Sequence, residues 1–206
     1  MKVIAALIAL VGSAAAFAPS AMKTKSSAVR VVLGDLPGSS DPIKNFDPLN
    51  LAELGSDETF LWFRAAELKH SRVAMIATTG YLVNAAGIHF PGQLSSDVSF
   101  ETLSAMKPFD AWAAVPDSGK SQILLTCFIA ELVTESKAVH YTKGGPLPTM
   151  VFPAIDFTNV REDIMLRKQR AELNNGRLAM IAIMSFIAAN NIPGSVPALA
   201  NIPAFN

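Results

Sequence analysis

The sequence has little charge and almost no cysteine. Of its 206 residues only 17% are charged, against roughly a quarter in an ordinary soluble domain, and half are hydrophobic. This balance predicts a one-domain membrane protein. The formal net charge is zero and no basic run is present, so nothing in the sequence suggests nucleic acid as a partner. The single cysteine, Cys127, excludes an internal disulfide, and because it lies in an apolar stretch we expect it to be buried.

The motifs of the common enzyme classes are also missing. The sequence contains no H-E-x-x-H metal motif, no glycine-rich phosphate loop and no Ser-His-Asp arrangement. An enzyme is therefore not expected. A membrane transporter or proton relay is an alternative of another class, although few spans are available for a translocation path.

Helical patterns account for most of the chain. The three segments that fit a helix are residues 59–86, 118–137 and 159–190. At 1.5 Å per residue the first is about 40 Å long, enough to cross a bilayer core. Asn159 and Glu162 are spaced as a capping box at the start of the third. Residues 33–56 and 90–117 are expected to be extended or loop segments. The predicted fold class is an all-α membrane protein with three transmembrane helices.

The first and third helical segments carry a repeated block. Residues 66–77 match residues 171–182 at eight of twelve positions, with a shift of 105 residues. Two copies are too few for a solenoid, so they predict a crossed pair of helices related by a pseudo-twofold axis. Small residues in the blocks, such as Ala74 and Gly176, would allow the two backbones to approach closely.

Each block places a Glu and an Arg five residues apart in an apolar helix. An ionisable group at membrane depth costs about 2.5–3.5 kcal/mol, so it needs a partner and usually has a function. Positions i and i+5 lie about 140° apart, so Glu67 does not naturally meet Arg72 in its own helix. If the helices cross symmetrically, Glu67 faces Arg177 and Glu172 faces Arg72. Two reciprocal ion pairs between the helices are predicted.

A second polar residue follows each Glu by three positions, His70 in the first block and Asn175 in the third helix. Positions i and i+3 share a helix face, so each helix presents two oxygen or nitrogen donors side by side. Ion pairs alone could be structural, because apolar replacements often stabilise a protein equally well. A carboxylate paired with Arg keeps a spare lone pair, however, and magnesium accepts oxygen ligands readily. The blocks therefore predict ligands for a magnesium ion with an open axial position.

The paired motifs Glu-x-x-His-x-Arg and Glu-x-x-Asn-Gly-Arg resemble those of the chlorophyll-binding proteins of plant and algal antennae, over about residues 46–192. The resemblance implies a light-harvesting function, with a photoprotective, energy-dissipating member as the alternative. It implies chlorophyll a, chlorophyll c and a carotenoid such as fucoxanthin, peridinin or a related xanthophyll. The axial chlorophyll ligands and ion-pair partners that it implies are Glu67, His70, Glu172, Asn175, Arg72 and Arg177.

The second helix offers further candidate ligands. Glu131 lies in the apolar run and aligns with a family ligand, with a solvated acid as the alternative, and Gln122 lies near the membrane edge. Glu135 shares a turn with Lys137 and is expected at the surface. Green-plant members carry a Gln or His fourteen residues after the third-helix Asn. This chain has Ala189 there, which leaves that pigment absent or water-ligated.

Two further segments carry the resemblance. Residues 46–49 and 152–156 resemble the segments that hold carotenoid end groups beside the crossed helices. Trp62, Trp112 and Tyr81 fit an aromatic belt at the bilayer surface.

The first 32 residues have the composition of a leader. Residues 1–16 show the basic start, apolar run and small residues of a signal peptide, and residues 17–32 carry basic and hydroxyl residues but no acid, as transit peptides do. Together they resemble the two-part leader of plastids acquired by secondary endosymbiosis. A plain secreted protein is the alternative. The expected location of residues 33–206 is the plastid thylakoid membrane, with photosystem core subunits, other antenna proteins and thylakoid lipid as partners.

Overall fold

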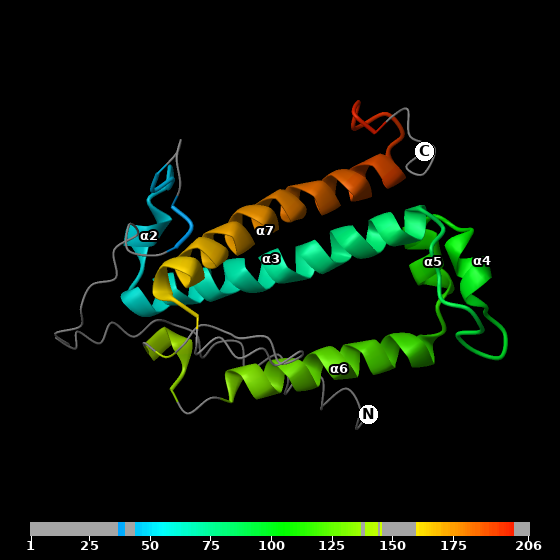
Figure 1. The fold of residues 1–206 in the computed structure, drawn as a ribbon, viewed down its shortest axis with the longest axis horizontal. Coiled ribbons are helices and arrows are strands. Elements are labelled where there is room, and N and C mark those ends of the chain that lie inside the picture. The colour runs from blue at the N-terminus through cyan, green and yellow to red at the C-terminus, as the bar shows by residue number, and fades with distance from the viewer. Residues whose placement is uncertain (1–36, 40–43, 137–138, 144, 146–159, 200–206) are drawn as a thin grey trace, which may run out of the picture. The chain divides into compact units, whose positions relative to one another are not determined.

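The computed structural model describes residues 37–39, 44–136, 139–143, 145 and 160–199 (Figure 1). All of them belong to one compact unit, Val31–Asn206. The predicted signal peptide, the transit-like segment and the second carotenoid segment, residues 152–156, lie outside the described residues.

Three long helices dominate the described residues. They are α3 (Asp57–Ala85), α6 (Asp117–Glu135) and α7 (Glu162–Asn191), and each begins and ends within three residues of a predicted segment. The short elements are α2 (Leu51–Leu54), α4 (Phe100–Ser104), α5 (Pro108–Ala114) and the 3-10 helix η3 (Tyr141–Lys143). Apart from an isolated bridge between Gln93 and Ser99, the described part of the chain contains no β-structure, so its all-α class is confirmed.

Among the described residues, no helix combines the length and the apolar character that crossing a membrane requires.

Local sequence signals explain both ends of α3. The Ser56 side chain accepts a hydrogen bond from the Thr59 N–H, and Asp57 and Glu58 place negative charge in the first turn, where the helix dipole favours it. At the other end Gly87 adopts a φ of +72° and its N–H donates to Asn84 O at 2.8 Å. Glycine tolerates this left-handed conformation, so the helix ends where the sequence predicts.

The start of α7 differs from the prediction. The helix begins at Glu162, and its N-cap, Arg161, makes no side-chain capping hydrogen bond. A capping box requires its acid at the third helical position, whereas Glu162 is the first, so the predicted box with Asn159 is wrong. Glu162 and Asp163 instead stabilise the first turn through the helix dipole.

The predicted loop at residues 90–117 contains two short helices. Ser99 caps α4 by accepting from the Thr102 N–H at 3.2 Å, and Pro108 is the first residue of α5. Proline is favoured at that position because its fixed φ suits a helix start. Leu103 of α4 and Ala111 of α5 are buried, which shows that both helices pack inward.

Helices α3 and α7 lie side by side and run in the same direction (Figure 1). Their buried surfaces follow the repeat. Three pairs of residues that are 105 positions apart are buried on both helices: Leu68 and Leu173, Ser71 and Gly176, and Ala74 and Ala179. A fourth pair, Tyr81 and Phe186, forms a ring stack with centroids 4.9 Å apart. Equivalent residues facing each other are what a pseudo-twofold pair of helices requires.

The structure corrects two expectations about single residues. Tyr81 was expected at the bilayer surface, but only 5% of it is exposed, because its ring packs between α7 and Phe109 of α5. Cys127 was expected to be buried but is exposed, since α6 buries none of its residues. Trp62 and Trp112 are exposed, as the belt expectation requires.

Candidate functional site

Two ion pairs join α3 and α7 in the reciprocal arrangement that the repeat suggests. Arg177 Nε donates to Glu67 Oε1 at 2.8 Å, and Arg72 Nε donates to Glu172 Oε1 at 2.6 Å. Each carboxylate therefore receives one positive partner from the opposite helix. The two Glu side chains are only partly covered, with 28% and 30% of their area exposed. A carboxylate in this position is charge-compensated and still accessible from outside the helix pair.

Sequence reasoning missed a second cation at the Glu67 site. Arg64 lies one turn before Glu67 on α3, and its Nη1 donates to Glu67 Oε2 at 2.8 Å. The Arg64 side chain is only 8% exposed. The i, i+3 spacing of Arg64 and Glu67 was the available signal, because such residues are neighbours on a helix. The shift of 105 places Gln169 at the equivalent position of the other copy.

A segment preceding α2 closes over this site. Arg177 Nη1 donates to Gly38 O at 2.8 Å, and Gly38 has a φ of +117°. A Cβ atom on Gly38 would be 3.0 Å from Leu173 Cδ1 and 3.2 Å from the Arg64 guanidinium. Glycine is therefore required both by the backbone conformation and by the close packing.

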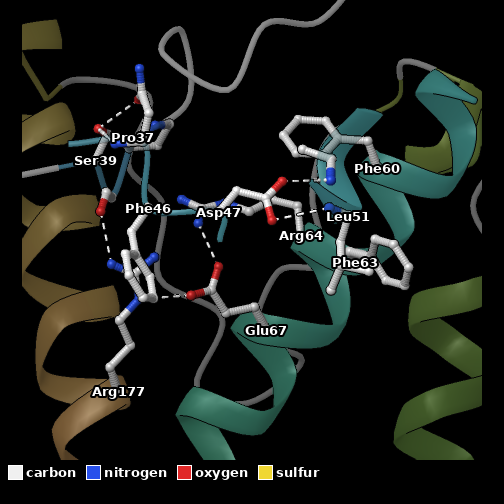
Figure 2. A pocket seen from close by; sticks show the side chains of 13 residues that line it. Pro37, Ser39, Phe46, Asp47, Leu51, Phe60, Phe63, Arg64, Glu67 and Arg177 are labelled. Atoms are coloured by element: carbon white, nitrogen blue, oxygen red, sulfur yellow. Dashed lines mark hydrogen bonds and ion pairs between the residues drawn. The ribbon is translucent and has the colours of Figure 1, made fainter. Parts of the chain in front are cut away.

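A groove of about 530 Å³ opens beside the ion pairs (Figure 2). Aromatic side chains form one part of its wall and the charged cluster forms another: Phe46, Phe60, Phe63, Arg64, Glu67 and Arg177. Asp47 also lines the groove, and its two carboxylate oxygens accept from the N–H groups of Leu51 and Ala52 at 3.0 and 2.8 Å at the start of α2. The segment 46–49, which resembles a carotenoid-holding segment, thus lies at this groove.

His70 and Asn175 are exposed on the outer surfaces of α3 and α7. The Nδ1 of His70 lies 2.8 Å from Ala66 O, and because a carbonyl only accepts, Nδ1 carries the proton. The lone pair is then on Nε2, which is the usual tautomer of a histidine that binds a metal through that atom. The Asn175 amide makes no hydrogen bond within the described part of the chain. Both side chains are therefore available to a ligand from outside the pair.

Apolar residues surround these donors symmetrically. The outward-facing pairs related by the repeat are Val73 and Leu178, at 66% and 67% exposed, and Ile76 and Ile181, both at 68%. Large apolar residues are thus equally exposed on the two helices. This indicates that apolar partners cover both surfaces in the functional protein.

On α6 the candidate ligands are already engaged in part. Lys69 Nζ of α3 donates to Glu131 Oε2 and to Glu135 Oε1, both at 2.6 Å. Glu135 also lies 2.6 Å from His140 Nε2 through its other oxygen, so it is not merely a surface acid. Gln122 is exposed near the start of the helix. α6 buries none of its residues, and within the part of the chain that the structure describes its hydrogen bonds to α3 are those from Lys69.

The segment after α6 packs beside this link. Tyr141 of η3 is buried, and the centroid of its ring lies 4.0 Å from the centroid of the His140 ring. Burial raises the pKa of the Tyr141 hydroxyl, and the nearby Glu135 carboxylate adds to the effect.

Ala189 is buried; it occupies the position at which green-plant members carry a Gln or His ligand. The neighbouring Asn190 has a buried Oδ1 with no hydrogen-bond partner among the described residues.

The donors occur singly. Nowhere in the described ranges do three His, Cys, Asp or Glu side chains come together in a way that could hold a metal ion. Glu67 and His70 on α3, and Glu172 and Asn175 on α7, can each offer one donor atom. One donor suits a metal ion that is already held by a ligand of its own and accepts one axial bond from the protein.

Comparison with known proteins gives consistent results. The family model described as Chlorophyll A-B binding protein matches residues 32–191. The chain is 33% identical over 192 residues to the chloroplastic fucoxanthin-chlorophyll a-c binding protein C of Phaeodactylum tricornutum, covering 89% of this chain and 92% of the relative. It is 34% identical over 204 residues to the Trieres chinensis fucoxanthin-chlorophyll a-c binding protein, covering 94% and 96%. With the corresponding protein of Chattonella marina var. antiqua it shares 35% identity over 196 residues, covering 90% and 85%.

Proposed function

Because the chain belongs to the Chlorophyll A-B binding protein family, we propose that it is a light-harvesting antenna of the fucoxanthin–chlorophyll a/c type. It binds chlorophylls a and c and fucoxanthin in the chloroplast and transfers excitation energy to a photosystem. The bound pigments supply the light absorption, and the protein fixes their spacing and orientation. We assign it no catalytic role.

Glu67, His70, Glu172 and Asn175 are proposed to be axial ligands of chlorophyll magnesium. The observation that carries this proposal is the crossed pairing: each Glu is compensated by an Arg of the other helix and remains partly exposed. Compensation removes the cost of a lone charge, and exposure leaves a carboxylate lone pair for the metal. The outward Nε2 of His70 supports the same role.

On α6, Glu131 is the better of the two candidate ligands. Its Oε2 is held by Lys69, whereas its Oε1 accepts no hydrogen bond from the described residues. One oxygen would then anchor the side chain while the other ligates. Gln122 is proposed as a ligand on its exposure and chemistry alone, because an amide oxygen also suits magnesium.

None of the three long helices has the apolar character of a typical membrane span. We nevertheless propose that α3, α6 and α7 cross the thylakoid membrane and that residues 33–206 form the pigment-binding domain. The repeated ion pairs support this, because charges at membrane depth are tolerated when paired. Residues 1–16 and 17–32 would direct the chain into the plastid. The partners would be photosystem core subunits, other antenna proteins and thylakoid lipid.

The photoprotective alternative gains no specific support. The acids that could sense lumen pH, Asp97, Glu101 and Asp110, are exposed around α4 and α5. Their surroundings do not distinguish them from ordinary solvated carboxylates.

Pigment reconstitution tests the ligand assignment. Glu67→Leu and Glu172→Leu should each lower the chlorophyll content of the refolded protein by one molecule, measured by chromatography of extracted pigments. Glu58→Leu is the matched control, because Glu58 lies in the exposed first turn of α3 and should keep every pigment. A full chlorophyll complement in both Glu67→Leu and Glu172→Leu would overturn the assignment.

A further inference from the structure

The two repeated carboxylates have different surroundings. Glu67 is bonded through Oε1 to Arg177 and through Oε2 to Arg64, each at 2.8 Å. Glu172 is bonded through Oε1 to Arg72, and its Oε2 accepts no hydrogen bond from the described residues. The difference arises because the position three residues before the Glu is Arg64 in one copy and Gln169 in the other.

The Arg64 guanidinium is held in place and is not a mobile surface charge. It is almost completely buried, and the Gly38 backbone packs so closely that an added Cβ would lie 3.2 Å from both Nη atoms. Figure 2 shows the Glu67 carboxylate between the Arg64 and Arg177 side chains at the edge of the groove. A planar guanidinium fixed in this way presents its charge to the carboxylate in one geometry.

The consequence is electrostatic. Counted over these ion-paired side chains alone, Glu67 with Arg64 and Arg177 carries a net positive charge, whereas Glu172 with Arg72 is neutral. A carboxylate with both oxygens in charge-assisted hydrogen bonds is also a weaker electron-pair donor than one with a single such bond. Both effects are stronger in a site with little water than in solution.

We propose that Arg64 is a positioning residue that makes the two repeat-related chlorophyll sites unequal. By holding Glu67 Oε2 and adding a fixed positive charge, it gives the chlorophyll on Glu67 a different excitation energy from the chlorophyll on Glu172. A fixed charge shifts an electronic transition because the ground and excited states differ in charge distribution, and protein groups tune cofactors in this way. The inference rests on the proposed ligand roles of Glu67 and Glu172.

The repeat supplies the test. Arg64→Gln gives the Glu67 site the residue that the Glu172 site has, and Gln169→Arg makes the opposite exchange. After reconstitution, Arg64→Gln should keep the wild-type chlorophyll content and displace one chlorophyll a band in the low-temperature absorption spectrum. Gln169→Arg should displace a different band in the opposite direction, because a charge is removed at one site and added at the equivalent place of the other.

Arg64→Lys is the control that separates charge from shape, since it keeps the positive charge but not the planar fork. Its band should stay nearer to the wild-type position than that of Arg64→Gln. An unchanged spectrum in Arg64→Gln and in Gln169→Arg, at full pigment content, would overturn the inference. So would loss of one chlorophyll from Arg64→Gln, because Arg64 would then be required for occupancy. Failure of the ligand assignment itself looks different: Glu67→Leu would keep all its chlorophyll.

Discussion

Ser71 and Gly176 lie against each other at the crossing of α3 and α7, and a Cβ atom on Gly176 would be only 2.3 Å from Ser71 Cβ. They are equivalent residues of the repeat, so the pseudo-twofold axis passes between them. Ser71 is completely buried there. This contact fixes the register of the two helices, and the register brings each Glu to the Arg of the opposite helix.

Gly176→Ala should therefore destabilise the helix pair. The added methyl group overlaps a Cβ and lies 3.0 Å from a backbone atom of Ser71, so no side-chain rotation removes the clash. Overpacking of this kind costs about 1–3 kcal/mol. Thermal denaturation of the reconstituted protein, followed by circular dichroism and by pigment release, should show a lower midpoint than the wild type.

The double variant Ser71→Gly with Gly176→Ser is the matched control. It exchanges the two residues across the pseudo-twofold axis and so keeps one small and one smaller side chain at the crossing. Its denaturation midpoint should lie closer to the wild type than that of Gly176→Ala. A midpoint no higher than that of Gly176→Ala would show that the contact does not follow the symmetry of the repeat.

Arg72→Leu and Arg177→Leu should each release chlorophyll from the opposite helix, at Glu172 and Glu67 respectively. The structure further predicts that the two variants lose unequal amounts of chlorophyll. Glu67 keeps Arg64 as a partner after Arg177→Leu, whereas Glu172 has no second cationic partner among the described residues. Chlorophyll content after reconstitution should consequently fall further in Arg72→Leu. Pigment loss confined to the mutated helix would contradict the crossed pairing.

Lys69→Met should loosen the attachment of α6 to α3. Its ammonium group bridges Glu131 and Glu135, and exposed pairs of this type contribute about 0.2–1 kcal/mol each. The denaturation midpoint should fall slightly, and the difference from the wild type should shrink in high salt because these charges are screened. Lys120→Met is the control, since Lys120 pairs with Asp117 within α6. Equal effects of the two substitutions would argue against a link between the helices.

Gly38→Ala should detach the segment that covers the Glu67 site. Its φ of +117° disfavours a side chain, and the new Cβ would press on Leu173 and Arg64. Strained backbone of this kind costs about 1–3 kcal/mol. Gly92→Ala is a close control, because its φ is +109° but nothing lies within 4 Å of the added Cβ. Faster hydrogen exchange around residue 38 is expected for Gly38→Ala, and exchange as slow as in the wild type would count against the packing described.

Some local features misled the sequence reading. Residues 90–117 were expected to be extended or loop, yet Pro108 begins α5, because the fixed φ of proline serves a helix start as well as a turn. Tyr81 suggested a surface aromatic until its partner Phe186 was placed beside it. In each case the local composition fitted two structures equally well. The choice between them depended on the start of a new element or on a neighbour that is distant in the sequence.

The sequence by itself determined the long helices and the crossed ion pairs. Helical periodicity is a local property, and a block repeated on two helices implies that Glu67 and Arg177 exchange roles with Glu172 and Arg72. Only the tertiary structure decided that Arg64 and Gly38 complete the Glu67 site and that Lys69 joins α6. These contacts break the symmetry of the repeat or join segments with no shared pattern. No periodicity encodes them, and they follow only from how the helices and the preceding segment pack.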